Sequence, residues 1–251
     1  MPLATVIVTS YNRPQLLKGC IESVLNQTMP DLELFVMDDP SEHSKEIKQV
    51  ICSFSDWRLK AFFEPSSLES RQIDKRFRYS LLINRALDIA SGKYISYLCD
   101  DDYYFPERLE KLCGYMEIHP HINVAFGRMY SRIFGSDHPE NPEIARTNDL
   151  LPDDSIVFNR QIVPENPAFF KEGPDPENVY GCDHNMVMHK KECLDHIQKP
   201  YWPEWPESDA TTGDQIFFRK LSRAGFIFFG IDCWACVKRF HSNYYDYNMS
   251  K

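Results

Sequence analysis

The chain has 251 residues, of which 43% are hydrophobic and 26% charged, and its formal net charge is −9. This length suits one α/β domain or one large domain with a smaller annex, and the apolar share is enough for a sizeable core. The acidic balance argues against a nucleic-acid-binding protein, which needs a basic face to replace phosphate counterions. An anionic ligand would have to be held locally, by a metal ion, backbone amides or a few arginines.

The apolar runs of the chain are short. Its start, MPLATVIVTSYNRP, is apolar for only about six residues and has no basic region before them, unlike a secretory leader. The late run from Gly225 to Ile231 is far shorter than the ~20 residues of a membrane span. We therefore expect a soluble, cytoplasmic protein without a transmembrane segment.

Eight cysteines are scattered along the chain, a pattern that favours reduced core thiols. Cys233 and Cys236 form a C-x-x-C pair, but a zinc site normally needs a second pair or suitably spaced histidines. Neither follows, so a zinc or redox role for this pair is the less favoured interpretation.

The first hundred residues alternate between strand and helix signals. Residues 3–10 are apolar and β-rich, as a strand buried on both faces should be, and Pro14 opens a helix with apolar residues at helical spacing. The pattern continues with strands over 32–39, 58–64 and 93–98 and helices over 44–54 and 78–90, the last of them stopped by Gly92. Such alternation predicts parallel strands joined by right-handed crossovers.

Three polar clusters lie at the carboxyl ends of predicted strands. They are residues 9–12 (TSYN), Asp38 with Asp39, and Asp100 to Asp102. In parallel α/β sheets, ligands bind outside the carboxyl ends of the strands. We therefore expect the three clusters to meet at one edge of the sheet and to form a ligand site.

The second half of the chain has a different composition. The segment over residues 136–177 is rich in proline, acid and asparagine and predicts long loops over the site. Regular structure is expected to resume as a strand and helix over 185–197, an amphipathic helix over 212–225 with Asp214 in its first turn, and strand over 226–240. The 17 prolines and 13 tyrosines favour a loop-built, aromatic-lined pocket.

Three consecutive carboxylates, Asp100, Asp101 and Asp102, are the clearest chemical signal. Like charges ~4 Å apart repel by about 1 kcal/mol even in water. Helix capping explains them poorly, because Pro106 is expected at the first helical position and residues 103–105 separate it from the acids. A solvated loop is the other structural explanation. Mg²⁺ and Mn²⁺ bind carboxylates together with phosphate oxygens, so the cluster predicts a metal–diphosphate site.

These motifs resemble a known family. VIVTSYNRP, LELFVMDD and INRALDIASGKYISYLCDDDYYFPERL resemble the inverting glycosyltransferases of family 2, most of all a spore-coat member, and CDHNMVMHK and GDQIFF resemble later blocks. The resemblance implies an α/β GT-A fold with a Rossmann-like, mostly parallel sheet flanked by helices. It also implies a single GT-A domain over 1–251, with a nucleotide-binding half (1–105) and a loop-rich acceptor-binding half (106–251).

The resemblance places the nucleotide at the ends of the first two strands. Thr9 would hydrogen-bond the base and Tyr11 would stack on it. Asp39 would accept the N3–H of a pyrimidine, which excludes cytosine and implies a UDP- or dTDP-sugar. Of the nearby arginines (Arg71, Arg76, Arg78 and Arg85), Arg71 or Arg78 is favoured to reach the diphosphate, for which a guanidinium fork is suited.

The resemblance also implies the ligands of a Mn²⁺ or Mg²⁺ ion. The first acid of the family motif approaches the ribose, a role for Asp100, and a later acid binds the metal. Asp101 is favoured as the main ligand. Asp102 comes next, because a literal D-x-D pattern would select Asp100 and Asp102. His241, in KRFHSNYY, corresponds to a histidine that completes the metal shell or touches the phosphates, although a lone surface histidine is an equal alternative.

Inversion is a single displacement that needs a base within reach of the acceptor hydroxyl. Asp214 occupies the position of that base in the family, whereas the structural alternative is a favourable interaction with the helix dipole. Gly213 stands where many members carry another acid. Asp183 is the alternative base or an acceptor-binding acid, and His184 is expected to pack or to face the acceptor.

The sequence thus predicts a metal-dependent inverting glycosyltransferase that transfers a hexosyl group from a UDP- or dTDP-sugar to a carbohydrate or glycan acceptor. Surface polysaccharide or coat glycan synthesis is the expected setting. The alternatives are a non-catalytic nucleotide-sugar-binding or coat protein on the same fold and, less favoured, a sugar nucleotidyltransferase. The latter usually carries a glycine-rich basic loop after the first strand, which TSYNRPQ lacks.

Overall fold

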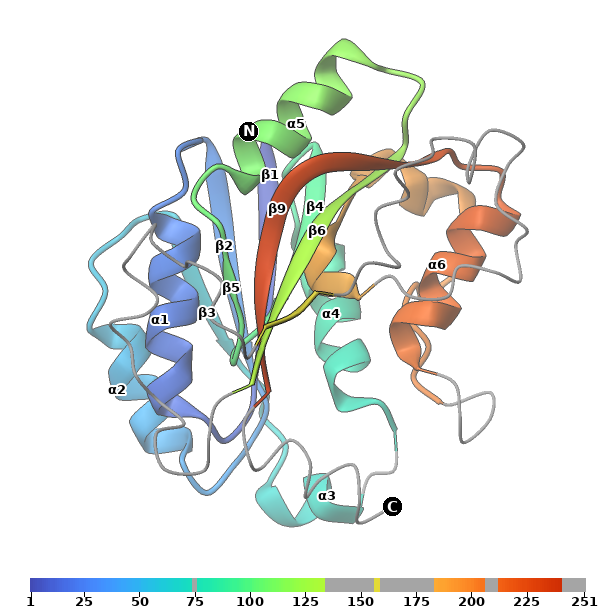
Figure 1. Ribbon diagram of the computed structural model, residues 1–251. Helices are drawn as coiled ribbons and strands as arrows, with labels where there is room; N and C mark the ends of the chain where they lie inside the picture. Colours follow the sequence, from blue (N-terminus) through green and yellow to red (C-terminus); the bar gives the residue numbers. More distant parts are fainter. Residues whose placement is uncertain (74–75, 134–155, 159–182, 206–211, 241–251) are drawn as a thin grey trace.

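The computed structural model describes residues 1–73, 76–133, 156–158, 183–205 and 212–240 (Figure 1). Its first half alternates strands and helices as predicted. The strands are β1 (Ala4–Ser10), β2 (Leu32–Asp38), β3 (Leu59–Phe63) and β4 (Tyr94–Cys99). The helices are α1 (Pro14–Leu25), α2 (Ser44–Cys52), α3 (Leu68–Ile73), which the sequence did not predict, and α4 (Arg78–Ile89).

The second half contains longer strands and shorter helices. Its strands are β5 (Tyr103–Tyr104), β6 (Val124–Ile133), β7 (Ile156–Phe158), β8 (Val187–Lys190) and β9 (Phe228–Phe240). Its helices are α5 (Arg108–Ile118), α6 (Gly213–Arg223) and two 3-10 helices, η3 (His184–Met186) and η4 (Lys191–His196). The α-helix expected after β8 is therefore a 3-10 helix. The strands β5, β6 and β7 were not predicted, and β7 lies in the segment expected to form loops.

One mixed sheet joins both halves, in the order β3-β2-β1-β4-β8-β6-β9-β5, with β7 paired to β6. The expected parallel arrangement holds for β3, β2, β1 and β4. β8 then runs antiparallel to both β4 and β6, and β6 pairs in parallel with β9. Figure 1 shows the long strands β6 and β9 curving across the molecule beside β4. The α/β class is confirmed, with a sheet that is parallel on one side and mixed on the other.

The core lies on both faces of the sheet because its central strands are buried on both sides. Val6, Ile7 and Val8 of β1 are all fully buried. Between β4 and α6, an aromatic cluster fills the core, in which Trp202 stacks on Phe217 with ring centroids 4.7 Å apart. Tyr97 of β4 also packs against Trp202 and Phe217, so this cluster ties α6 to β4.

Within the described part of the chain, no helix is both long enough and apolar enough to span a membrane.

Candidate active site

The three polar clusters meet at the carboxyl edge of the sheet, as predicted. The Asp39 N–H donates to the carbonyl of Ser10 at 2.9 Å, and the Asp100 N–H donates to the carbonyl of Thr9 at 3.2 Å. The Tyr11 N–H donates to Asp100 Oδ2 at 2.7 Å. Backbone contacts between neighbouring strand ends therefore hold Thr9, Tyr11, Asp39 and Asp100 in one site.

Asp39 is buried against Arg78 from the start of α4. Arg78 Nη2 lies 2.7 Å and its Nε 3.2 Å from Asp39 Oδ1, and Nη2 also reaches Ser66 Oγ at 3.2 Å. A guanidinium in contact with a carboxylate through two nitrogens fixes the orientation of that carboxylate. Arg78 thus lies at the end of β2, beside the predicted base-reading acid.

The other candidate arginines have different surroundings. Arg76 pairs with Glu204 at 3.3 Å, and Arg85 pairs with Glu64. Arg71 lies in the short helix α3.

Asp38, the neighbour of Asp39, is also buried. Burial, together with the charges of Asp100 and Asp39, raises the pKa of Asp38 to about 7. Asp38 is therefore largely protonated below neutral pH, which limits the negative charge at the end of β2.

Arg13 is a site residue that the sequence reasoning missed. Its Nη1 lies 3.2 Å from Asp100 Oδ1 and also contacts Asp101 Oδ2. Asn12 precedes it with φ of 61°, a left-handed conformation that asparagine tolerates better than most residues. Burial alone would lower the pKa of Arg13, but the charges of Asp100 and Asp101 outweigh it and raise the pKa. The sequence did contain a signal for this role, namely a basic residue in the TSYNRP loop, close to the predicted acid cluster.

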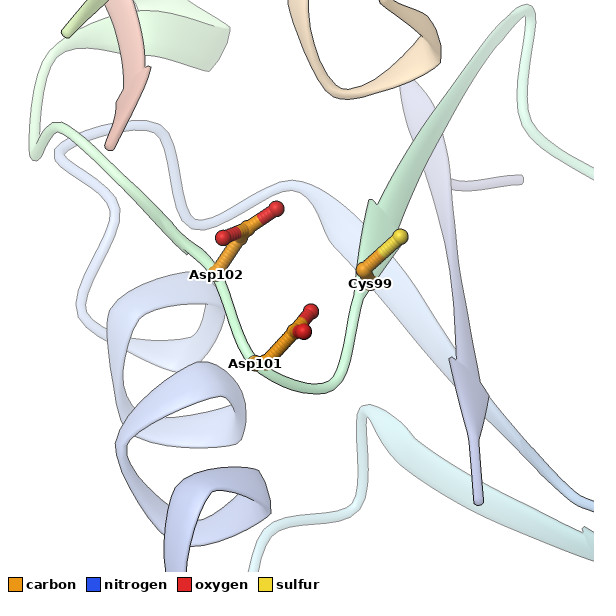
Figure 2. A group of neighbouring side chains, drawn as sticks. All are labelled: Cys99, Asp101 and Asp102. Carbon is orange, nitrogen blue, oxygen red and sulfur yellow. The ribbon is translucent and has the colours of Figure 1, made fainter. Parts of the chain in front are cut away.

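The predicted metal ligands lie on the loop after β4 (Figure 2). One ligand atom each from Cys99, Asp101 and Asp102 can be chosen so that all lie within 4.8 Å of one another. Both aspartates are buried, and Asp102 accepts a hydrogen bond from Asn185 Nδ2 at 2.7 Å.

This donor set fits a hard divalent cation through its two carboxylates, since Mg²⁺ and Mn²⁺ prefer oxygen ligands. Burial, together with the charges of Asp101 and Asp102, raises the pKa of the Cys99 thiol far above its usual value. Sulfur is a soft ligand that these hard cations disfavour, so Asp101 and Asp102 are the residues suited to hold the ion. His241 lies outside the described residues.

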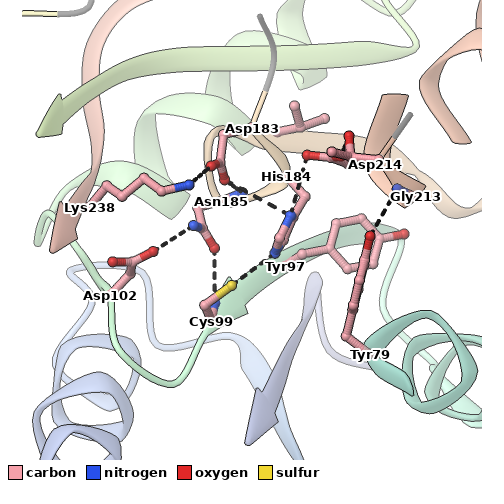
Figure 3. A network of polar contacts seen from close by, with 12 residues as sticks. Tyr79, Tyr97, Cys99, Asp102, Asp183, His184, Asn185, Gly213, Asp214 and Lys238 are labelled. Atoms are coloured by element: carbon pink, nitrogen blue, oxygen red, sulfur yellow. Dashed lines mark hydrogen bonds and ion pairs between the residues drawn. The ribbon is translucent and has the colours of Figure 1, made fainter. Parts of the chain in front are cut away.

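Asp183 is fixed by its own contacts (Figure 3). It caps η3 by accepting a hydrogen bond from the Asn185 N–H at 3.0 Å, and it pairs with Lys238 of β9. Burial opposes its ionisation, but the charges of Lys238 and His184 outweigh this and lower the pKa of Asp183 to about 2.

Asp214 lies in the first turn of α6, as predicted. Thr212 Oγ1 and the Gln215 N–H, the latter at 3.1 Å, donate to its Oδ1, and His184 Nδ1 lies 3.7 Å from its Oδ2. Burial favours a neutral His184, but the Asp214 and Asp183 carboxylates outweigh it and raise the pKa of His184.

Gly213 allows α6 to begin against α4. Its N–H donates to Tyr79 Oη at 2.9 Å. A Cβ at this position would lie 2.5 Å from Tyr79 Oη and 2.8 Å from Ser80 Oγ. Close packing therefore explains why a glycine stands at this position.

Comparison with known proteins identifies the family to which this chain belongs. Residues 5–195 match the sequence profile of glycosyl transferase family 2, so the chain belongs to this family. The nearness to a spore-coat member stays a prediction.

Two curated relatives illustrate the range of similarity. The chain is 31% identical over 222 residues to Protein CgeD of Bacillus subtilis (strain 168), covering 87% of this chain and 46% of that protein. It is 29% identical over 184 residues to the GalNAc(5)-diNAcBac-PP-undecaprenol beta-1,3-glucosyltransferase of Campylobacter jejuni, covering 68% of this chain and 56% of that protein. The chain thus spans about half the length of these relatives.

Solved structures show the same fold. TarS 1-349 of S. aureus in complex with UDP-GlcNAc superposes with a TM-score of 0.63 at 18% identity, over 94% of this chain and 58% of that one. The mannosyltransferase PcManGT of Pyrobaculum calidifontis, in complex with GDP-Man and Mn²⁺, gives a TM-score of 0.62 at 17% identity, over 94% and 56%. The chain therefore has the GT-A fold.

Proposed function

We propose that this chain is a metal-dependent inverting glycosyltransferase that uses a UDP- or dTDP-sugar and a hydroxyl of a carbohydrate or glycan acceptor. Surface polysaccharide or coat glycan synthesis is the proposed setting. The observation that carries the proposal is the convergence of the acids behind β4 with Asp214 of α6 through one network of contacts. Family membership supports catalysis of this class.

The proposed donor site uses Thr9, Tyr11 and Asp39 for the base. Arg78 acts through Asp39, because a carboxylate held by a guanidinium fork presents its remaining lone pairs in a fixed direction. An N3–H donor of uracil or thymine satisfies such an acceptor, whereas cytosine offers no hydrogen there. Arg71 remains the proposed diphosphate ligand and Asp100 the proposed ribose contact. UDP-GlcNAc in the TarS structure supports a uridine nucleotide.

Asp101 and Asp102 are the proposed ligands of Mn²⁺ or Mg²⁺, with His241 as a third. The Mn²⁺ reported with PcManGT supports this cofactor. When bound, the ion would neutralise the charge that grows on the departing diphosphate. The burial of both carboxylates would strengthen that interaction, since water screens it less.

Asp214 is the proposed general base. It takes the proton of the acceptor hydroxyl while the acceptor oxygen bonds to the anomeric carbon and the bond from that carbon to the diphosphate oxygen breaks. Asp183 suits this role less, because its pKa of about 2 makes it a weak base and Lys238 holds it. We assign Asp183 to positioning and to acceptor binding.

We also propose that residues 1–251 form one GT-A domain, with 1–105 binding the nucleotide and 106–251 the acceptor. The sheet supports this, since Tyr103 and Tyr104 of β5 pair with Val237 and Cys236 of β9. A non-catalytic nucleotide-sugar-binding protein is the alternative function, and turnover separates the two.

The test measures binding first. Calorimetry with UDP, dTDP, GDP and CDP, each with and without Mn²⁺, should show binding of UDP or dTDP that Mn²⁺ strengthens, and no comparable binding of CDP or GDP. Asp101→Asn should remove the effect of Mn²⁺ and leave the choice of base unchanged.

Turnover is measured as release of nucleoside diphosphate with a panel of glycan acceptors. Asp214→Asn should lower kcat by about 10²- to 10⁴-fold, the usual contribution of a general base, while nucleotide binding stays intact. An unchanged rate in Asp214→Asn, with activity lost in Asp101→Asn, would show that the base is another residue. Binding without turnover on any acceptor would favour the non-catalytic alternative.

A further inference from the structure

His184 connects the two ends of the proposed active site (Figure 3). On one side its Nδ1 lies 3.7 Å from Asp214 Oδ2 and 3.9 Å from Asp183 Oδ1. On the other side its Nε2 lies 3.2 Å from Cys99 Sγ, at the end of β4. The imidazole thus bridges the proposed base and the strand that precedes the proposed metal ligands.

Aromatic packing fixes the plane of this imidazole. The Tyr79 ring stacks on it with centroids 6.3 Å apart and planes 12° from parallel, and the Trp202 ring stands perpendicular at 5.7 Å. Tyr79 also accepts the hydrogen bond from the Gly213 N–H. The same tyrosine therefore orients His184 and the first turn of α6, where Asp214 lies.

The surroundings determine which nitrogen of His184 carries a proton. Because Nδ1 faces two carboxylates, it is the protonated nitrogen whether the ring is neutral or charged. In the neutral form, Nε2 accepts from the Cys99 thiol, which keeps its hydrogen. Nδ1 accordingly directs an N–H toward Asp214 in both forms.

His184 also differs from the other partners of Asp214. Thr212 and Gln215 belong to the same helix start as Asp214 and move with it. Within the described ranges, His184 is the one hydrogen-bond or ion-pair partner that ties the Asp214 side chain to another element. An enzyme needs such a tie, because misplacing a reacting group by about 1 Å can cost 10²-fold in rate.

We propose that His184 is a positioning residue that holds the Asp214 carboxylate toward the acceptor and fixes its place relative to the metal-binding end of β4. This inference rests on the proposed function, in which Asp214 is the base. His184 makes no contact with the reacting atoms in this role.

Two substitutions separate positioning from packing. His184→Phe keeps an aromatic ring for Tyr79 and Trp202 and removes the N–H toward Asp214. His184→Asn places an amide N–H close to the position of Nδ1. We expect kcat to fall about 10- to 100-fold in His184→Phe and to recover most of this loss in His184→Asn. KM for the donor, calorimetric UDP binding in Mn²⁺ and the thermal unfolding midpoint should stay close to those of the unchanged protein.

Three outcomes would overturn the inference. The first is a kcat in His184→Phe within twofold of the unchanged protein while Asp214→Asn is inactive. The second is an equal loss in both His184 variants together with weaker UDP binding, which would show a structural role. The third is full activity in Asp214→Asn. That result would refute Asp214 as the base, and the positioning role of His184 would then have no object.

Discussion

The guanidinium of Arg13 and a divalent cation would compete for the same carboxylate. Asp101 contacts Arg13 and is also the favoured metal ligand, and Asp100 shares Arg13 at 3.2 Å. Asp102 instead accepts a hydrogen bond from the side chain of Asn185. One guanidinium thus offsets part of the charge of the three carboxylates, and a cation at Asp101 would have to compete with Arg13 for that carboxylate.

Arg13→Gln should therefore bind Mn²⁺ more tightly when no nucleotide is present. The side chain of Arg13 is 34% exposed, so solvent screens the ion pair and the gain should be about 3- to 10-fold, near 1 kcal/mol. Free Mn²⁺ measured by electron paramagnetic resonance during a titration gives the dissociation constant. Lys18→Gln is the matched control, because it removes the same charge from an exposed position on α1. Equal or weaker Mn²⁺ binding in Arg13→Gln than in this control would contradict the competition.

At the scale of elements, Gly92 shows how closely the α4–β4 connection packs on β1. The sequence suggested that Gly92 stops the preceding helix, and α4 does end nearby, at Ile89, but among the described glycines only Gly225 has the positive φ typical of a helix-ending glycine. Instead, a Cβ on Gly92 would lie 2.4 Å from the Thr5 nitrogen and 2.6 Å from the Ala4 carbonyl carbon. The glycine is required by close approach of two backbones.

Gly92→Ala should lower the free energy of unfolding by about 1–3 kcal/mol, because neither β1 nor the connection can move without disturbing the sheet. Urea unfolding followed by circular dichroism measures the change. Gly114→Ala in α5 is the control, since its Cβ would meet nothing within 4 Å and a helical alanine is favourable by up to about 1 kcal/mol. If both variants had the same free energy of unfolding, the close approach of the β1 backbone would not be the reason for a glycine at position 92.

The elements that could be predicted are those specified by local sequence. β1, β2 and β4 are apolar on both faces, and α1 and α4 have clear helical spacing. β6 was missed because its pairing is long-range and irregular: its register with β9 shifts between Phe126 and Met129. At the site, the positions of the acids at strand ends were enough to predict that they converge. The pairing of Arg13 with Asp101 and of Arg78 with Asp39 depends on loop conformation, so it could not be predicted from the sequence.

For the whole molecule, β8 is the strand that joins the parallel and mixed parts of the sheet. It lies between β4 and β6, and its His189 is fully buried at this junction. His189 Nδ1–H donates to the carbonyl of Lys190 at 2.8 Å, which leaves Nε2 to accept from Tyr97 Oη at 2.7 Å. The two parts of the sheet are therefore joined next to a titratable group that is held neutral.

Burial lowers the pKa of His189 to about 4, below the value of ~6.5 in an unfolded chain. The unfolded state then binds a proton more readily than the folded state, so the stability provided by the neutral imidazole is complete above pH ~6.5 and is lost as the pH falls toward 4. The shift corresponds to a loss of up to about 3 kcal/mol.

His189→Gln should be less stable than the unchanged protein at pH 7.5, because the core packing and both hydrogen bonds are altered. The difference in unfolding free energy between the two proteins should then shrink as the pH falls from 6.5 to 4.5, since the glutamine does not titrate. Urea unfolding at several pH values measures this difference, with His43→Gln, at an exposed histidine, as the control for the loss of an imidazole. If the difference in unfolding free energy stayed constant for His189→Gln, His189 would protonate in the folded protein without loss of stability. Acid would then not destabilise the sheet at this junction.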